Sequence, residues 1–87
     1  MPCINVLIAD RYAAIVQGLS KALGAQHDFD VVACCRDGTS CIEAIRSLRP
    51  DIAVLDASMP SLTGLEILSI VDSEGFSTRV VLFTLAF

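Results

Sequence analysis

Four short runs along the chain are apolar at almost every position, and amphipathic stretches separate them. The runs are INVLIA (Ile4–Ala9), FDVVACC (Phe29–Cys35), IAVL (Ile52–Leu55) and VVLF (Val80–Phe83). Strands that are apolar on both faces are typical of a parallel sheet covered by helices on both sides. We therefore expect four parallel strands at these positions.

The intervening stretches repeat apolar residues with helical spacing. The first spans Ala13–Leu23, and Gly24 is expected to stop it. The second is expected to start at Ser40, where Ser40 and Glu43 would form a capping box, and to end before Pro50. These two helices connect the first three strands.

A third helix is expected after Thr63, which forms a capping box with Glu66. Its sequence is apolar nearly all round, which predicts heavy burial, and Gly75 follows it in a loop. The element order is then βαβαβαβ. Right-handed crossovers make a doubly wound α/β sheet with strand order 2-1-3-4 the economical arrangement. Eighty-seven residues make one domain.

Composition narrows the class of protein. The chain is 54% hydrophobic and carries a net charge of −4 without a lysine or arginine cluster, so direct nucleic-acid binding by this segment is not expected. No apolar run reaches the roughly 18 residues of a membrane helix, and the N-terminus lacks a signal peptide pattern. These features predict a cytoplasmic protein that does not enter a membrane.

Cysteine and histidine give no sign of a metal or redox motif. The four cysteines form no CxxC pair, so we expect small buried or half-buried thiols. His27 has no second metal-type side chain nearby in the sequence and is expected in a surface loop.

Three polar residues follow strands that should end at the same edge of the sheet. Asp10 follows the first strand, Asp56 ends the third and Thr84 ends the fourth. Neighbouring strands lie about 4.8 Å apart, and two carboxylates so close repel each other unless a cation lies between them. Mg²⁺ prefers oxygen ligands, and a carboxylate can also attack phosphorus to give an aspartyl phosphate. Asp51 should lie at the opposite edge as a solvated strand start.

The segments VLIAD (Val6–Asp10), DIAVLDASMPSLTGLEIL (Asp51–Leu68) and VVLFT (Val80–Thr84) resemble the receiver domain of bacterial two-component response regulators. The resemblance is greatest to the subfamily joined to LuxR-type helix-turn-helix domains. It implies a flavodoxin-like fold in which Asp56 is the phosphoacceptor and Thr84 the switch hydroxyl. Asp10 and Asp56 would belong to the acidic Mg²⁺ pocket. The loop after the third strand would be shaped by Met59, Pro60 and Gly64.

The resemblance also implies a function and partners. A sensor histidine kinase would phosphorylate this regulatory module, which is not an enzyme. An output domain, DNA-binding in the LuxR-type subfamily, would then control transcription. The resemblance covers residues 1–87 as a partial receiver domain, without the fourth helix, fifth strand and fifth helix of the full fold.

Two departures from the family favour an alternative, a degenerate or truncated receiver that acts only in protein interaction or dimerisation. Arg11 stands where the family has a second acid that contacts the metal, and an arginine cannot ligate Mg²⁺. Arg11 either points into solvent or pairs with Asp56 or a phosphate. The family's lysine after the fifth strand has no counterpart here. An apolar fourth strand at the sheet edge further predicts a homo-oligomer formed through that strand or uncovered sheet faces.

Two enzyme classes fit less well. Haloacid-dehalogenase-like phosphatases need a second aspartate two residues after the first, and that position is Ser58. A dinucleotide-binding fold needs GxGxxG after the first strand, and ADRYAAIVQG contains none.

Overall fold

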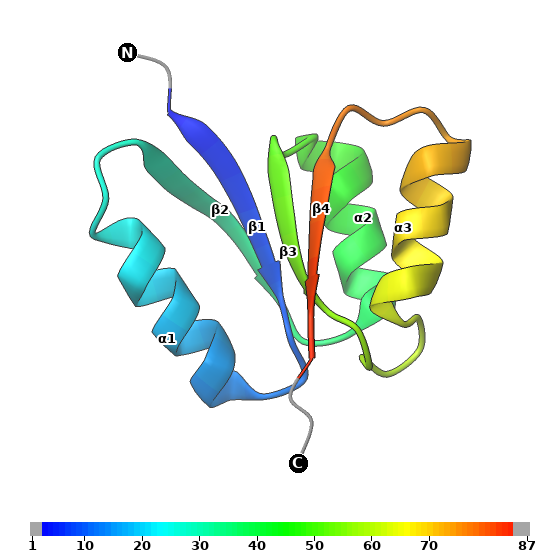
Figure 1. Ribbon diagram of the computed structural model, residues 1–87, viewed down its shortest axis with the longest axis horizontal. Helices are drawn as coiled ribbons and strands as arrows, with labels where there is room; N and C mark the ends of the chain where they lie inside the picture. The colour runs from blue at the N-terminus through cyan, green and yellow to red at the C-terminus, as the bar shows by residue number, and fades with distance from the viewer. Residues whose placement is uncertain (1–2, 85–87) are drawn as a thin grey trace.

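The four apolar runs form one parallel sheet in a computed structural model that describes residues 3–84 (Figure 1). The strands are β1 (Ile4–Ala9), β2 (Phe29–Cys35), β3 (Ile52–Asp56) and β4 (Arg79–Phe83). Their order across the sheet is β2-β1-β3-β4, with every neighbouring pair parallel. The predicted order 2-1-3-4 is therefore confirmed.

Three helices cover the two faces of this sheet. Figure 1 shows α1 (Ala13–Gly24) on one side, and α2 (Gly38–Leu48) and α3 (Gly64–Ser73) together on the other. Arg46 and Glu74 join the ends of α2 and α3 through an ion pair of 2.7 Å. The hydrogen bond to Arg46 lowers the pKa of the Glu74 carboxyl and raises that of the arginine.

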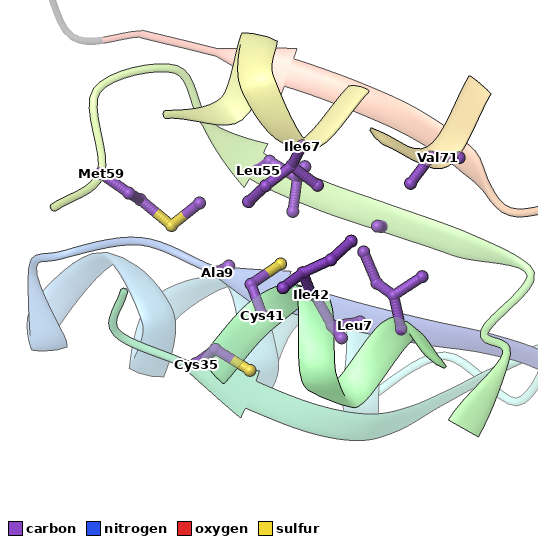
Figure 2. Packing of buried hydrophobic residues seen from close by; sticks show 11 residues of the cluster. Leu7, Ala9, Cys35, Cys41, Ile42, Leu55, Met59, Ile67 and Val71 are labelled. Atoms are coloured by element: carbon purple, nitrogen blue, oxygen red, sulfur yellow. The ribbon is translucent and has the colours of Figure 1, made fainter. Parts of the chain in front are cut away.

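Alternate residues of the central strands build a separate core on each face. Leu7 and Leu55 are fully buried among residues of α2 and α3, where Ile45 and Ile67 pack against them (Figure 2 shows Leu7, Leu55 and Ile67). On the other face, Ile8 packs beneath α1 in a smaller cluster. Both faces of β1 are thus apolar and buried, as its unbroken hydrophobic run predicted.

Strand β2 contains a bulge that changes which residues face each helix layer. Val6 pairs with Val31, but Leu7 pairs with Ala33, so the register shifts past Val32. As a result Val31 packs in the α1 cluster, whereas Ala33 packs in the α2–α3 cluster. In a strand without a bulge, residues two positions apart such as Val31 and Ala33 would lie on the same face.

The predicted start of the second helix is wrong by two residues. The helix begins at Gly38, and its N-cap is Asp37, whose Oδ1 accepts a hydrogen bond of 2.8 Å from the Ser40 backbone N–H. The Ser40 hydroxyl donates to Asp37 Oδ2 at 3.1 Å, so no Ser40–Glu43 capping box closes the helix. Aspartate is as good an N-cap as serine, and Asp37, which the sequence analysis did not consider, caps this helix.

The other helix termini follow their sequence signals more closely. Thr63 and Glu66 form the predicted capping box. Gly24 is the last residue of α1 and is followed by Ala25 in a right-handed conformation, so it is not a left-handed glycine cap. Gly75, after α3, does form a left-handed glycine cap. Its φ is +71°, and the Phe76 N–H donates to Val71 O at 3.1 Å, as in a Schellman motif.

Helix α3 is less buried than its composition predicted. Ile67 and Val71 are buried, but Leu65 is 62% exposed and Leu68 is 39% exposed. The expectation of heavy burial was wrong because the sheet and α2 contact only one side of this helix within the described residues. On the opposite face of the sheet, Val81 of β4 is 51% exposed.

The cysteines are free, and half of them are at the surface. Cys35 and Cys41 are buried, whereas Cys3 and Cys34 are exposed, so the expectation of buried or half-buried thiols holds only for the first pair. His27 is exposed, as predicted. Across residues 3–84, none of the helices has the length and apolar character needed to cross a membrane.

Candidate functional site

The strand register brings Asp10 and Asp56 side by side. Ala9 pairs with Leu55, and the two acids are the next residues on their strands. Asp56 in turn pairs with Phe83, which immediately precedes Thr84. All three predicted site residues therefore meet at one edge of the sheet. They line a cleft of about 490 Å³ together with Arg11, Tyr12, Ala14, Ile15 and Ser58.

Each carboxylate is fixed by its own loop. Asp10 is 1% exposed, and its Oδ1 accepts a hydrogen bond of 2.8 Å from the Tyr12 N–H. Asp56 is 6% exposed, and its Oδ1 accepts one of 3.0 Å from the Ser58 N–H. These short-range bonds orient the two side chains before any ligand arrives.

The second oxygen of each acid has no hydrogen-bond partner in the described part of the chain. No protein donor contacts either Oδ2 within residues 3–84. No side-chain nitrogen or oxygen in this part of the chain is both fully buried and unpaired. Asp10 and Asp56 thus each present one free oxygen where Thr84 also lies, and that oxygen is available to a ligand or an electrophile.

Arg11 brings a positive charge to the same cleft. Its guanidinium carbon lies 4.8 Å from the centroid of the Tyr12 ring. Among residues 3–84, no carboxylate lies within 4.0 Å of it, so the sequence hypothesis of a direct pair with Asp56 is not met. Arg11 is exposed to solvent and also lines the cleft.

Arg36 fixes the backbone of Arg11. Its Nε and Nη2 donate to the Arg11 carbonyl at 3.0 and 2.8 Å, which joins the loop after β2 to the loop after β1. Sequence reasoning gave no role to Arg36. Its place directly after an apolar strand was the available signal.

The loop after β3 is anchored in the hydrophobic core by Met59. Met59 is 3% exposed and extends into the core cluster that contains Ala9 and Cys41 (Figure 2). Gly64 lies so close that a Cβ atom there would sit 2.7 Å from both Asp56 O and Leu82 Cδ2. A side chain at this position would therefore displace the strand end that carries Asp56.

The same loop is also tied to the start of α2. The Gly38 N–H donates to Pro60 O at 3.0 Å, and the backbone N–H and hydroxyl of Thr39 both donate to Ser61 Oγ, at 3.0 and 2.9 Å. Ser61 has a φ of +66°, a conformation that costs energy for a residue with a side chain. These bonds hold it there, and sequence analysis did not foresee this tie.

Asp51 lies at the opposite edge of the sheet, as expected, but it is more than a solvated residue. Its Oδ2 accepts a hydrogen bond of 2.8 Å from the Asn5 N–H, and its own N–H donates to Asn5 O at 2.9 Å. Asp51 therefore clamps the starts of β1 and β3. It takes no part in the cleft.

The residues of the cleft supply only part of a magnesium coordination shell. Mg²⁺ takes oxygen ligands in octahedral geometry, and Asp10 and Asp56 supply two free carboxylate oxygens. The third charged side chain in the cleft is Arg11, which cannot ligate a cation and repels one. Within residues 3–84 no group of three or more metal-binding side chains occurs.

Comparison with known proteins identifies the family. Residues 6–87 match the response regulator receiver domain. The chain is 38% identical over 71 residues to the transcriptional regulatory protein BtsR of Salmonella typhi, a match that covers 82% of this chain and 30% of that protein. The chain belongs to the response regulator receiver domain family.

Solved structures agree with this assignment. The signal receiver domain of the response regulator NarL from Mycobacterium tuberculosis superposes with a TM-score of 0.97 at 29% identity, covering 100% of this chain and 70% of that one. A DNA-binding response regulator of the LuxR family from Staphylococcus aureus gives 0.89 at 25% identity, covering 93% and 68%. The predicted resemblance to receiver domains, with LuxR-type regulators among them, is confirmed.

Receiver domains of this kind are regulatory; they interact with histidine kinases and output domains and typically bind Mg²⁺ at the phosphorylation site. The chain spans between 16% and 38% of the length of the first curated relatives it matches. The functions of those whole proteins therefore extend beyond the segment that this chain matches.

Proposed function

We propose that this protein is a phosphoacceptor module phosphorylated on Asp56. The observation that carries the proposal is the state of that carboxylate: one oxygen is fixed by Ser58 and the other is free in a cleft shared with Asp10 and Thr84. An immobile carboxylate with one free oxygen is arranged for nucleophilic attack.

The free Asp56 oxygen attacks the phosphorus of the donor. A phosphorus–oxygen bond forms, the bond from phosphorus to the leaving group breaks, and its electron pair departs with that group. The Ser58 N–H continues to hold Oδ1, and the Thr84 hydroxyl donates to a new phosphoryl oxygen. Asp10 and Asp56 are the side chains that would contact Mg²⁺, but no step depends on it here.

The biological setting follows from the family. The phosphoryl donor is a sensor histidine kinase in the cytoplasm, and phosphorylation biases a two-state surface near Thr84. An output domain, DNA-binding as in the LuxR-family relative, reads that surface and controls transcription. The exposed apolar surface of β4 supports self-association of the chain.

The experiment is phosphorylation by a small acyl phosphate with excess Mg²⁺, followed by intact-mass measurement. The protein should gain the mass of one phosphoryl group, and Asp56→Asn should gain none. Asp51→Asn is the matched control, since it removes the same charge at the opposite edge of the sheet and should be phosphorylated normally.

One observation favours a second candidate function. Arg11 occupies part of the cleft and weakens any metal site there, which suits a receiver that acts only in protein interaction or dimerisation. The same experiment separates the two functions. Unmodified protein under all donor and Mg²⁺ concentrations, with normal folding, would support the interaction module and contradict phosphorylation.

A further inference from the structure

The cleft contains two carboxylates and one cation, and a phosphoryl group would change that balance. Asp10 and Asp56 contribute two negative charges, and Arg11 is the sole cation among the residues that line the cleft in the described part of the chain. A phosphoryl group on Asp56 carries about 1.5–2 negative charges at pH 7 and replaces the single charge of the carboxylate, so the cleft becomes more negative by up to about one charge. Such a charge is stabilised only when a cation or several hydrogen-bond donors face it.

Arg11 has the chemistry that this group needs. Its guanidinium is planar, always charged, and presents two parallel donors that match phosphate oxygens. Its guanidinium nitrogens lie beyond 4.0 Å of either carboxylate, so it is not already paired with Asp10 or Asp56. The guanidinium donors are therefore not occupied by either carboxylate.

One contact fixes the backbone of Arg11 and another supports its guanidinium. Arg36 donates two hydrogen bonds to the Arg11 carbonyl, and the Tyr12 ring supports the guanidinium at 4.8 Å. Cation–π contact stabilises a side chain over an aromatic face without using its N–H donors. The guanidinium is therefore held near the cleft while its donors stay available.

We infer that Arg11 acts as the protein's own cation for the phosphoryl group on Asp56. Phosphoryl transfer to this chain consequently proceeds without the Mg²⁺ that receiver domains typically bind. This inference rests on the proposed function, because it concerns the same carboxylate and the same reaction.

The step balances without a metal. The Asp56 oxygen forms a bond to phosphorus, and the leaving group takes the electron pair of the bond that breaks. For an acyl phosphate donor the leaving group is a carboxylate, and no proton transfer is required. Arg11 forms hydrogen bonds to the transferring phosphoryl oxygens and makes no covalent bond.

The test measures the rate of phosphorylation by an acyl phosphate in excess Mg²⁺ and in excess chelator, by intact mass. The unmodified protein should react in chelator within about tenfold of its rate in Mg²⁺, a barrier difference of about 1.4 kcal/mol. Arg11→Gln should lose about 100-fold in chelator, the scale of removing one preorganised electrostatic donor. Arg11→Lys keeps the charge but not the paired donors, and should recover part of that loss.

Two further variants separate a role for Arg11 in the reaction from a structural role. Arg11→Asp restores an acid to the pocket, and should react only when Mg²⁺ is present. Arg79→Gln removes the same charge as Arg11→Gln from an exposed position at the start of β4, and should react like the unmodified protein. If Arg11 were purely structural, Arg11→Lys would not recover the rate in chelator, and Arg11→Asp would not make the reaction dependent on Mg²⁺.

Tyrosine fluorescence gives a second readout. Tyr12 is the only tyrosine and the chain contains no tryptophan, so emission reports the surroundings of the ring beside Arg11. Beryllofluoride, added in chelator, should draw the guanidinium from the ring and change Tyr12 emission in the unmodified protein but not in Asp56→Asn.

The outcomes are distinguishable. A phosphoryl adduct that requires Mg²⁺ and forms equally well in Arg11→Gln would overturn the role of Arg11 while leaving Asp56 as phosphoacceptor. Failure to modify Asp56 under any condition would overturn the proposed function together with this inference.

Discussion

Gly38 and Leu62 approach so closely that a Cβ atom on Gly38 would overlap the carbonyl oxygen and Cβ of Leu62. Gly38 is the first residue of α2, and Leu62 lies in the loop between β3 and α3. This contact, with the bonds from Thr39 to Ser61, fixes the position of the loop that follows Asp56.

Gly38→Ala should destabilise the protein by about 1–3 kcal/mol, because a methyl group cannot fit without moving the loop backbone. Chemical denaturation measures the loss. Gly18→Ala is the matched control: no atom lies within 4 Å of its added Cβ, and it lies in the interior of α1. That change should stabilise by about 0.5–1 kcal/mol. Equal effects in the two variants would contradict the close contact.

Thr84→Ala should separate phosphorylation from the response to it. Thr84 is exposed, so the variant should fold with nearly unchanged stability, within about 0.5 kcal/mol. It should still accept a phosphoryl group on Asp56. Loss of one hydrogen bond, about 1 kcal/mol, should weaken beryllofluoride binding about fivefold, measured by titration. Thr84→Ser retains the hydroxyl, and an equal loss in that variant would argue against a hydrogen-bonding role.

The four cysteines should differ in alkylation. Burial raises the pKa of the Cys41 thiol from 9.0 to about 12, and burial also raises that of Cys35. At pH 8, a thiol reagent should modify Cys3 and Cys34 within minutes and spare the other two until the chain unfolds, as peptide mass mapping would show. Because the pKa of the Cys41 thiol is higher in the folded chain than in the unfolded chain, the contribution of this buried thiol to the free energy of unfolding is complete below about pH 9. That contribution declines as the pH rises toward 12. Rapid labelling of Cys41 in folded protein would contradict its burial.

Self-association should depend on the apolar surface of β4. Val81 is 51% exposed on the sheet face that carries α1, and a lysine at an edge strand opposes pairing with another chain. We expect Val81→Lys to weaken association of the 87-residue chain about tenfold or more, a change of about 1.4 kcal/mol. Size-exclusion chromatography with light scattering at micromolar concentration measures this. Leu65→Lys, on exposed α3, is the control; a monomeric unmodified protein would contradict the prediction.

The order of strands and the meeting of Asp10, Asp56 and Thr84 were predictable because they follow from hydrophobic runs and parallel connections. Such runs identify a buried parallel strand with little ambiguity, and crossover handedness then orders the sheet. The position of the acid after each run decides which edge it reaches.

What could not be predicted depended on contacts between distant segments. Asp37 and Ser40 were equally good N-caps by type, and no local rule chose between them. The burial of α3 depended on what contacts its outer side, which leaves Leu65 exposed. The bonds from Arg36 to the Arg11 carbonyl join two loops that are 25 residues apart in sequence. Propensity and periodicity contain no information about such long-range pairings.

The extra residue in β2 has a consequence for how this strand tolerates change. Because Val32 shifts the alternation, the first half of the strand packs in the α1 cluster and the second half packs in the α2–α3 cluster. Deleting Val32 would make Val31 and Ala33 direct neighbours on opposite faces, which keeps Val31 opposite Val6 and Ala33 opposite Leu7. The strand is thus two half-strands in opposite phase, and the loss of Val32 between them would leave each half facing its present helix layer.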